Sequence, residues 1–209
     1  MKIFRLSYFF LPLQSPVSSP SSAHNIIKQC LHLDPDSKPC LTAHRLIKKL
    51  DRSFTSLDDL ISKEDWRGVI NLVIGAGKEK DKAFARKFDE ALENHATREN
   101  VLGSEKLHIP FPDPKVVSPR KEYIVRAVCR AYIQLGDARN GGKWCDTLLT
   151  MPGMEEDEYG LVGKGEALLL KEEWDEAVRV FEKAFDASGR SSRDVSMLSS
   201  ILYHAMLTP

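Results

Sequence analysis

Apolar residues recur every three or four positions along most of the chain, the spacing of amphipathic α-helices. The clearest segment runs from Glu158 to Gly189, where a break between Lys171 and Glu173 separates two helical stretches. A second segment, from Glu122 to Gly153, has a break of the same kind at Leu135–Asp137. Its second stretch ends at Pro152 and Gly153, residues that are common just beyond a helix. The pattern predicts two consecutive pairs of packed helices.

The two segments also share residue types at the places where paired helices meet. Gly165 in a first helix is small enough for the second helix to approach closely, and Phe181 with the small residues Ala177 and Ala184 then interlocks across the pair. These types at this spacing are the signature of the tetratricopeptide repeat (TPR), a unit of about 34 residues. The signature positions are Tyr132, Gly136, Gly165, Trp174, Ala177, Phe181 and Ala184. We therefore predict an all-α fold, an α-solenoid of TPR helix pairs that comprises residues 120–153 and 158–189.

Residues 23–77 fit the repeat frame less completely. The turn at Pro35 ends a partial repeat, and helical spacing from about Pro39 to Ser62 predicts one long helix shared by two repeat positions. Trp66 then opens a third, degenerate repeat after a break at Lys63–Asp65.

The remaining segments lie outside the frame. Residues 78–119 hold an amphipathic stretch, Lys78–Leu92, and a proline-rich loop, which we interpret as an insertion. Residues 1–22 combine a basic start with a short apolar run, so they are either an unstructured leader or a weak secretory signal. Residues 190–209 are expected to form a tail or an apolar capping helix.

The charge balance excludes several classes of partner. The chain has 30 basic and 30 acidic residues, which gives no reason to expect nucleic acid or an anionic membrane as partner. No apolar run approaches the roughly 18 residues needed to span a bilayer. Four of the six histidines, His24, His95, His108 and His204, have no matching nucleophile or carboxylate at a helical spacing. We therefore predict a binding scaffold that is not an enzyme and needs no cofactor or metal.

The four cysteines allow three interpretations. Cys129 and Cys145 fall on facing sides of one helix pair, and Cys30 and Cys40 flank the turn at Pro35, so each pair could be bridged. All four could equally be buried free thiols of a cytosolic protein. Zinc is a further alternative, with His32 and His44 completing a set with Cys30 and Cys40.

Two strings of residues resemble one known family. The string Lys28–Lys38 with the helix that follows it, and the run Glu172–Arg193, are similar to the endoplasmic-reticulum TPR-and-J-domain co-chaperones, the second string to their fungal branch. In that family a TPR array holds unfolded or misfolded polypeptides, and a DnaJ-type J domain passes them to the lumenal Hsp70. The resemblance implies the same partners, a location in the endoplasmic-reticulum lumen, and two intramolecular disulfides, at Cys30/Cys40 and Cys129/Cys145.

One feature of that family is missing. A J domain needs a His-Pro-Asp loop to stimulate Hsp70, and the sequence contains no His-Pro-Asp. We therefore expect the C-terminal TPR units of such a co-chaperone without its J domain. The alternative function is that of a cytosolic TPR adaptor that docks a partner's peptide.

Overall fold

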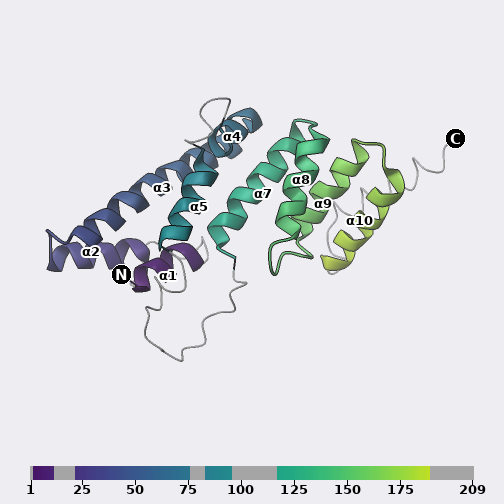
Figure 1. Cartoon of the computed structure of the whole chain (residues 1–209). Coiled ribbons are helices and arrows are strands. Elements are labelled where there is room, and N and C mark those ends of the chain that lie inside the picture. The colour runs from purple at the N-terminus through teal and green to yellow at the C-terminus, as the bar shows by residue number, and fades with distance from the viewer. Residues whose placement is uncertain (1, 12–21, 76–82, 96–116, 189–209) are drawn as a thin grey trace. The chain divides into compact units, whose positions relative to one another are not determined.

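Regular structure is entirely helical in the part of the chain that the computed structural model describes, residues 2–11, 22–75, 83–95 and 117–188 (Figure 1). This confirms the all-α prediction for those residues. The helices are α1 (Lys2–Phe10), α2 (Ala23–Leu33), α3 (Lys38–Ser62), α4 (Trp66–Val73), α5 (Phe84–His95), α7 (Pro119–Gln134), α8 (Ala138–Leu149), α9 (Glu158–Leu169) and α10 (Trp174–Ala187).

Helix ends follow the chemistry of the turn residues. The carboxylate of Asp137 accepts the backbone N–H of Asn140 at 3.0 Å, and that of Asp157 accepts the N–H of Gly160 at 2.8 Å, so both residues cap the helix that they precede. The bond from the Asn140 backbone lowers the pKa of Asp137. Gly136, just before the cap, has φ +72°, which glycine adopts without strain.

The helices form two compact units. Unit 1 comprises residues 1–64 and 71–121, and unit 2 comprises residues 65–70 and 122–209. In unit 1, α2 packs against both α1 and α3. In unit 2, α9 packs against both α8 and α10, and the four helices from α7 to α10 follow one another side by side in Figure 1.

Aromatic rings form the core of unit 1. Phe54 of α3 meets two rings of α5 edge to face, with centroid distances of 4.9 Å to Phe84 and 5.8 Å to Phe88. Phe9 of α1 reaches the same cluster, 5.9 Å from Phe88. Such pairs contribute about 0.5–1.5 kcal/mol each beyond the burial of their area. The cluster therefore joins three helices that are distant in the sequence.

Helix α1 corrects one expectation from the sequence. The unstructured leader expected for residues 1–22 is wrong for residues 2–10, which are helical, with Phe4, Tyr8 and Phe9 at most 1% exposed. The Tyr8 hydroxyl donates to Asp51 of α3 at 2.9 Å, and the Ser118 hydroxyl donates to the carbonyl of Phe9 at 2.6 Å. The apolar run fits this role because its aromatic residues fall on one helix face. The secretory-signal interpretation stays a prediction.

Other expectations are met or shifted by a few residues. The long helix expected from about Pro39 to Ser62 is α3, whose first turn contains Pro39. The amphipathic helix expected at Lys78–Leu92 is described from Phe84 to His95. Residues 78–82, most of the proline-rich loop and the expected tail at 190–209 lie outside the described residues.

Candidate binding surfaces

The signature glycine of the last repeat lies where the repeat frame places it, against an aromatic ring. A Cβ atom added to Gly165 of α9 would lie 2.6 Å from Cζ of Phe181 in α10, so no side chain fits there while the ring keeps its position. Ala177 and Ala184, one turn before and after Phe181, are completely buried. These four residues are therefore part of the packing between α9 and α10.

The other signature residues lie near the turns between paired helices. Trp66 and Trp174 are the first residues of α4 and α10, and Trp174 is 44% exposed. Burial and the nearby Asp137 carboxylate raise the pKa of Tyr132, which lies in the last turns of α7. Gly136 forms the α7–α8 turn.

The first candidate surface consists of seven half-buried or exposed residues on the two first helices of unit 2. We call it the helix-A face: Tyr123, Arg126 and Arg130 of α7, with Tyr159, Val162, Glu166 and Leu169 of α9. Within each helix these residues are three or four positions apart and so share one side. None of the seven is completely buried, and Tyr159 is 69% exposed.

Arg126 joins the two halves of this face. Its guanidinium forms ion pairs with Glu122, at 2.8 Å, and with Asp157, the residue that caps α9. The same group lies 5.3 Å from the ring centroid of Tyr159, within the range of a cation–π contact. Arg126 thereby positions the exposed ring on α9 relative to α7.

The face also holds a carboxyl group in a less polar environment. Partial burial raises the pKa of Glu166, and no opposing cation contributes to that shift. Near the other end, the guanidinium of Arg130 lies 5.0 Å from the ring centroid of Trp66. The helix-A face thus presents aromatic, apolar and charged groups in one strip.

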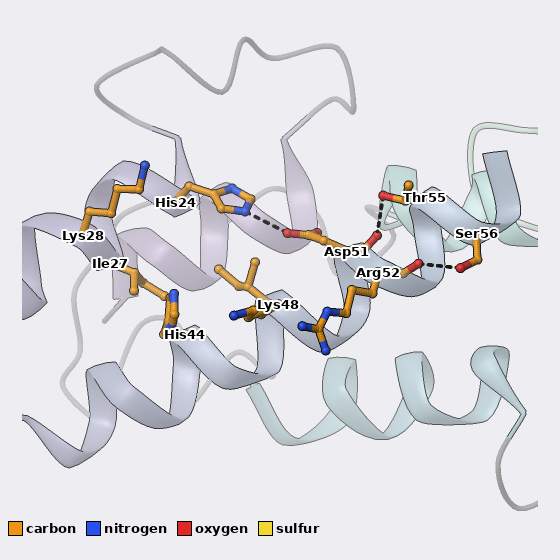
Figure 2. Close-up of a pocket in the computed structure, with 10 residues that line it drawn as sticks. His24, Ile27, Lys28, His44, Lys48, Asp51, Arg52, Thr55 and Ser56 are labelled. Carbon is orange, nitrogen blue, oxygen red and sulfur yellow. Dashed lines mark hydrogen bonds and ion pairs between the residues drawn. The ribbon is translucent and has the colours of Figure 1, made fainter. Parts of the chain in front are cut away.

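A second candidate surface is a groove between α2 and α3, within unit 1 (Figure 2). Ile27 and Ile47, both nearly buried, form its floor. The polar residues along it are His24, Lys28, His44, Lys48, Asp51, Arg52, Thr55 and Ser56. In Figure 2 the ring of His24 points at Asp51, and their Nε2 and Oδ2 atoms are 2.8 Å apart.

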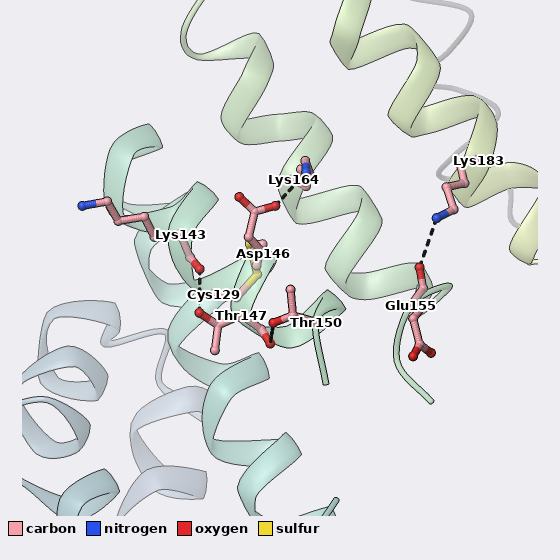
Figure 3. A network of polar contacts seen from close by, with 9 residues as sticks. Cys129, Lys143, Asp146, Thr147, Thr150, Glu155, Lys164 and Lys183 are labelled. Carbon is pink, nitrogen blue, oxygen red and sulfur yellow. Dashed lines mark hydrogen bonds and ion pairs between the residues drawn. A yellow bond between two sulfur atoms is a disulfide. The ribbon is translucent and has the colours of Figure 1, made fainter. Parts of the chain in front are cut away.

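The structure joins Cys129 of α7 to Cys145 of α8 through a disulfide, with a Cα–Cα distance of 5.0 Å (Figure 3). Both cysteines are buried, together with Ile133 and Ala167. Gly163 of α9 lies directly against the bridge, because a Cβ atom added there would be 2.9 Å from each sulfur. On the outside, Lys164 pairs with Asp146 at 2.7 Å. The bridge therefore lies in the core formed by three helices.

The second disulfide joins Cys30 at the end of α2 to Cys40 at the start of α3, with a Cα–Cα distance of 6.3 Å. Cys30 is half-buried and Cys40 is buried. The sulfurs of Cys30 and Cys40, which the zinc alternative needs as ligands, are bonded to each other in the structure. Among the described residues, no group of three or more His, Cys, Asp or Glu side chains is arranged to hold a metal ion. The oxidised state of all four cysteines in the cell stays a prediction.

A further feature of the described residues concerns membranes. None of the described helices combines the length and the apolar character that crossing a bilayer requires.

Neither the helix-A face nor the groove could be located from sequence spacing, because each depends on which helix packs beside which. The signal that the sequence offered for the face is the recurrence of aromatic, charged and apolar residues three or four positions apart in the first helix of each pair.

The sequence is similar to curated fungal proteins. No family model matches it. It is 34% identical over 190 residues to the tetratricopeptide repeat and J domain-containing co-chaperone DNJ1 of Cryptococcus neoformans var. grubii serotype A, covering 87% of this chain and 34% of that protein. The co-chaperone of the same name from Mycosarcoma maydis is 30% identical over 193 residues, 91% of this chain and 32% of that protein. The chain thus spans about a third of the length of these relatives.

A solved structure has a similar fold. The crystal structure of the P58(IPK) TPR domain matches with a TM-score of 0.59 at 16% identity, covering 90% of this chain and 43% of that one. At this identity the likeness concerns the fold. Together with the helical architecture it confirms the predicted class, an α-solenoid of TPR helix pairs.

Proposed function

Because this chain is a homologue of the fungal tetratricopeptide repeat and J domain-containing co-chaperones, we propose that it is a client-binding co-chaperone module for unfolded or misfolded polypeptides. It acts by binding and performs no catalysis. In the full-length relatives, a J domain would deliver the bound clients to an Hsp70. The chain itself contains no His-Pro-Asp, so these residues alone would bind clients without stimulating the Hsp70 ATPase.

The helix-A face is the observation that carries this proposal. An unfolded polypeptide offers apolar side chains and free backbone groups in no fixed order, so its receptor needs apolar contacts beside polar ones. Exposed Tyr159 supplies the first kind, together with the accessible parts of Val162 and Leu169, which also pack against the core between α9 and α10. Arg130 and Glu166 supply the second kind. Tyr159 is the most exposed aromatic group of the face, and Arg126 already holds it in place. Little side-chain entropy is lost when a client covers a ring held in this way.

We assign the module to the endoplasmic-reticulum lumen. The two disulfides support this location, since such bonds persist in oxidising compartments and are rare in the cytosol. Alkylation of the protein in intact cells, followed by mass spectrometry, should show no modified cysteine before reduction and four afterwards. Four cysteines that react without reduction would favour the cytosolic adaptor instead.

Client binding is tested with a permanently unfolded protein. Fluorescence anisotropy should show that the chain binds reduced, carboxymethylated α-lactalbumin and not native α-lactalbumin. Tyr159→Ala should weaken this binding about tenfold, since truncation of a central aromatic contact commonly costs more than 1 kcal/mol.

The matched control removes an exposed apolar side chain away from the face. Leu33→Ala at the end of α2, where the side chain is 86% exposed, should leave the affinity within about twofold of the original. Equal losses in the two variants, or equal binding of native and unfolded α-lactalbumin, would overturn the proposal.

A further inference from the structure

The groove between α2 and α3 carries an excess of positive charge. Lys28 projects from α2, and Lys48 and Arg52 project from α3 (Figure 2). All three side chains are exposed, and none forms an ion pair with any described residue of the protein. The groove encloses about 590 Å³, room for several residues of a bound chain.

The one carboxylate among the lining residues is already occupied. Asp51 accepts the hydroxyl of Tyr8 at 2.9 Å through one oxygen, and its other oxygen lies 2.8 Å from His24. The hydroxyl of Thr55 donates to the backbone carbonyl of Asp51, and so does not compete for the carboxylate. Asp51 is thus turned toward α1 and α2, and among the described residues no acidic side chain pairs with Lys48 or Arg52.

The cations on α3 are spaced for an extended chain. Lys48 and Arg52 are four residues apart, so they lie on one side of α3 about 6 Å apart along the helix axis. Alternate side chains of an extended polypeptide point the same way and are about 6.6 Å apart. We propose that this groove binds an extended acidic polypeptide segment with a carboxylate at every second residue.

The groove fits a peptide better than a nucleic acid. Proteins that bind single strands combine cations with aromatic rings on which bases stack, and no aromatic ring of Phe, Tyr or Trp lines this groove. Cations line the groove from both helices, Lys28 from α2 and Lys48 and Arg52 from α3, so carboxylates on an extended chain can reach both sides. The Cys30–Cys40 bridge ties α2 to α3 at one end, which fixes the channel before binding.

This site differs from the client-binding face in its residues and in its chemistry. The helix-A face belongs to unit 2 and offers aromatic and apolar contacts, whereas the groove belongs to unit 1 and selects charge and spacing. The test of the groove and the test of the helix-A face can therefore give different results, and failure of one proposal leaves the other standing. A partner with an acidic extended tail would bind here while an unfolded client occupies the helix-A face.

The test uses the full chain and a fluorescein-labelled decapeptide of alternating glutamate and serine. Fluorescence anisotropy at low salt should show binding of this peptide, and a peptide of alternating glutamine and serine should not bind. A decapeptide with the same five glutamates at positions 1, 2, 5, 6 and 9, where no two of them are two residues apart, should bind at least threefold more weakly, because no pair of its carboxylates matches the spacing of Lys48 and Arg52. Lys48→Gln/Arg52→Gln should weaken binding of the alternating peptide about tenfold.

Two further variants make the outcome decisive. Arg45→Gln/Lys49→Gln removes the same charge from exposed positions of α3 outside the groove, and should change affinity less than twofold. Lys28→Gln tests the opposite wall and should weaken binding about threefold. Equal losses in the two double variants would overturn the proposal, as would equal binding of the glutamine peptide. Tighter binding of a ten-residue oligothymidylate at the same residues would identify a nucleic-acid surface instead.

Discussion

The turns between paired helices in unit 2 require one residue in the left-handed region. Gly136 fills that place between α7 and α8, with φ +72°, and Glu172 fills it between α9 and α10, with φ +63°. Glycine adopts this conformation freely, whereas a residue with a Cβ atom pays about 1–2 kcal/mol for it. Glu172 therefore retains strain that Gly136 avoids.

Glu172→Gly should increase the free energy of unfolding by up to about 1 kcal/mol, because it relieves this strain. The gain is limited because glycine also raises the conformational entropy of the unfolded chain. Urea unfolding followed by circular dichroism measures the change. Glu182→Gly, at an exposed position within α10, is the matched control and should cost about 1 kcal/mol. Destabilisation by Glu172→Gly would show that the left-handed turn is not strained.

A second residue-scale effect concerns Glu166 on the helix-A face. Burial raises the pKa of its carboxyl in the folded protein, so the folded state binds more protons than the unfolded state between the two pKa values. Stability should therefore fall as pH rises from about 4.5 through the raised pKa. Glu166→Gln removes this loss and should raise the melting temperature at pH 7 while making little difference near pH 4. A difference that is independent of pH would contradict this assignment.

At the scale of single elements, helix boundaries were predictable where turn residues mark them. The breaks at Lys63–Asp65 and Lys171–Glu173 place the starts of α4 and α10, and Pro39 places the start of α3. Helix α1 was missed because an apolar run near the N-terminus also fits a leader. Its helical role depends on the rings of Phe54 and Phe88, which come from elements far along the chain.

The two disulfides should differ in their rate of reduction. Cys129 and Cys145 are covered by α9, whereas Cys30 is half-buried at the end of a hairpin. Because a thiolate must reach the sulfur that it attacks, Cys30–Cys40 should be reduced first. Timed treatment with dithiothreitol, alkylation and peptide mass spectrometry give the order.

Loss of the buried Cys129–Cys145 bridge should also lower the free energy of unfolding more than loss of Cys30–Cys40. Cys129→Ala/Cys145→Ala should lower the free energy of unfolding by about 3 kcal/mol, the chain-entropy value for a loop of 16 residues. Simultaneous reduction of both bridges under native conditions would contradict the difference in burial.

At the scale of the whole molecule, the fold class could be predicted from the sequence, whereas the binding surfaces could not. The repeat signature could be recognised because Gly165 and Phe181, which pack against each other, lie within one helix pair and are close in the sequence. The helix-A face instead needs Arg126 beside Asp157, and the groove needs Asp51 beside Tyr8. Such contacts join separate elements, and no local pattern marks them in advance.

The packing of α1 predicts that unit 1 depends on it. Phe9→Ala should destabilise unit 1 by about 3–5 kcal/mol, since Phe9 is completely buried beside Phe88. Hydrogen exchange should quicken in α3 and α5, and exchange in α9 and α10 should stay unchanged because their core lies within unit 2. Ile3→Ala, at a side chain that is 67% exposed, is the control and should have little effect. No change on Phe9→Ala would mean that α1 is not part of the core.

The order of the cysteines along the chain has a consequence for biosynthesis. Each bridge joins consecutive cysteines, over 10 and 16 residues, and neither loop encloses or crosses the other. These four cysteines allow three complete pairings. Because the chain is synthesised from its N-terminus, Cys30 and Cys40 are available for pairing before Cys129 and Cys145 have been translated. In the proposed lumenal location, the pairing seen in the structure would be the first one available to these four cysteines at each stage, so their oxidation during synthesis should need an oxidant and little help from a disulfide isomerase.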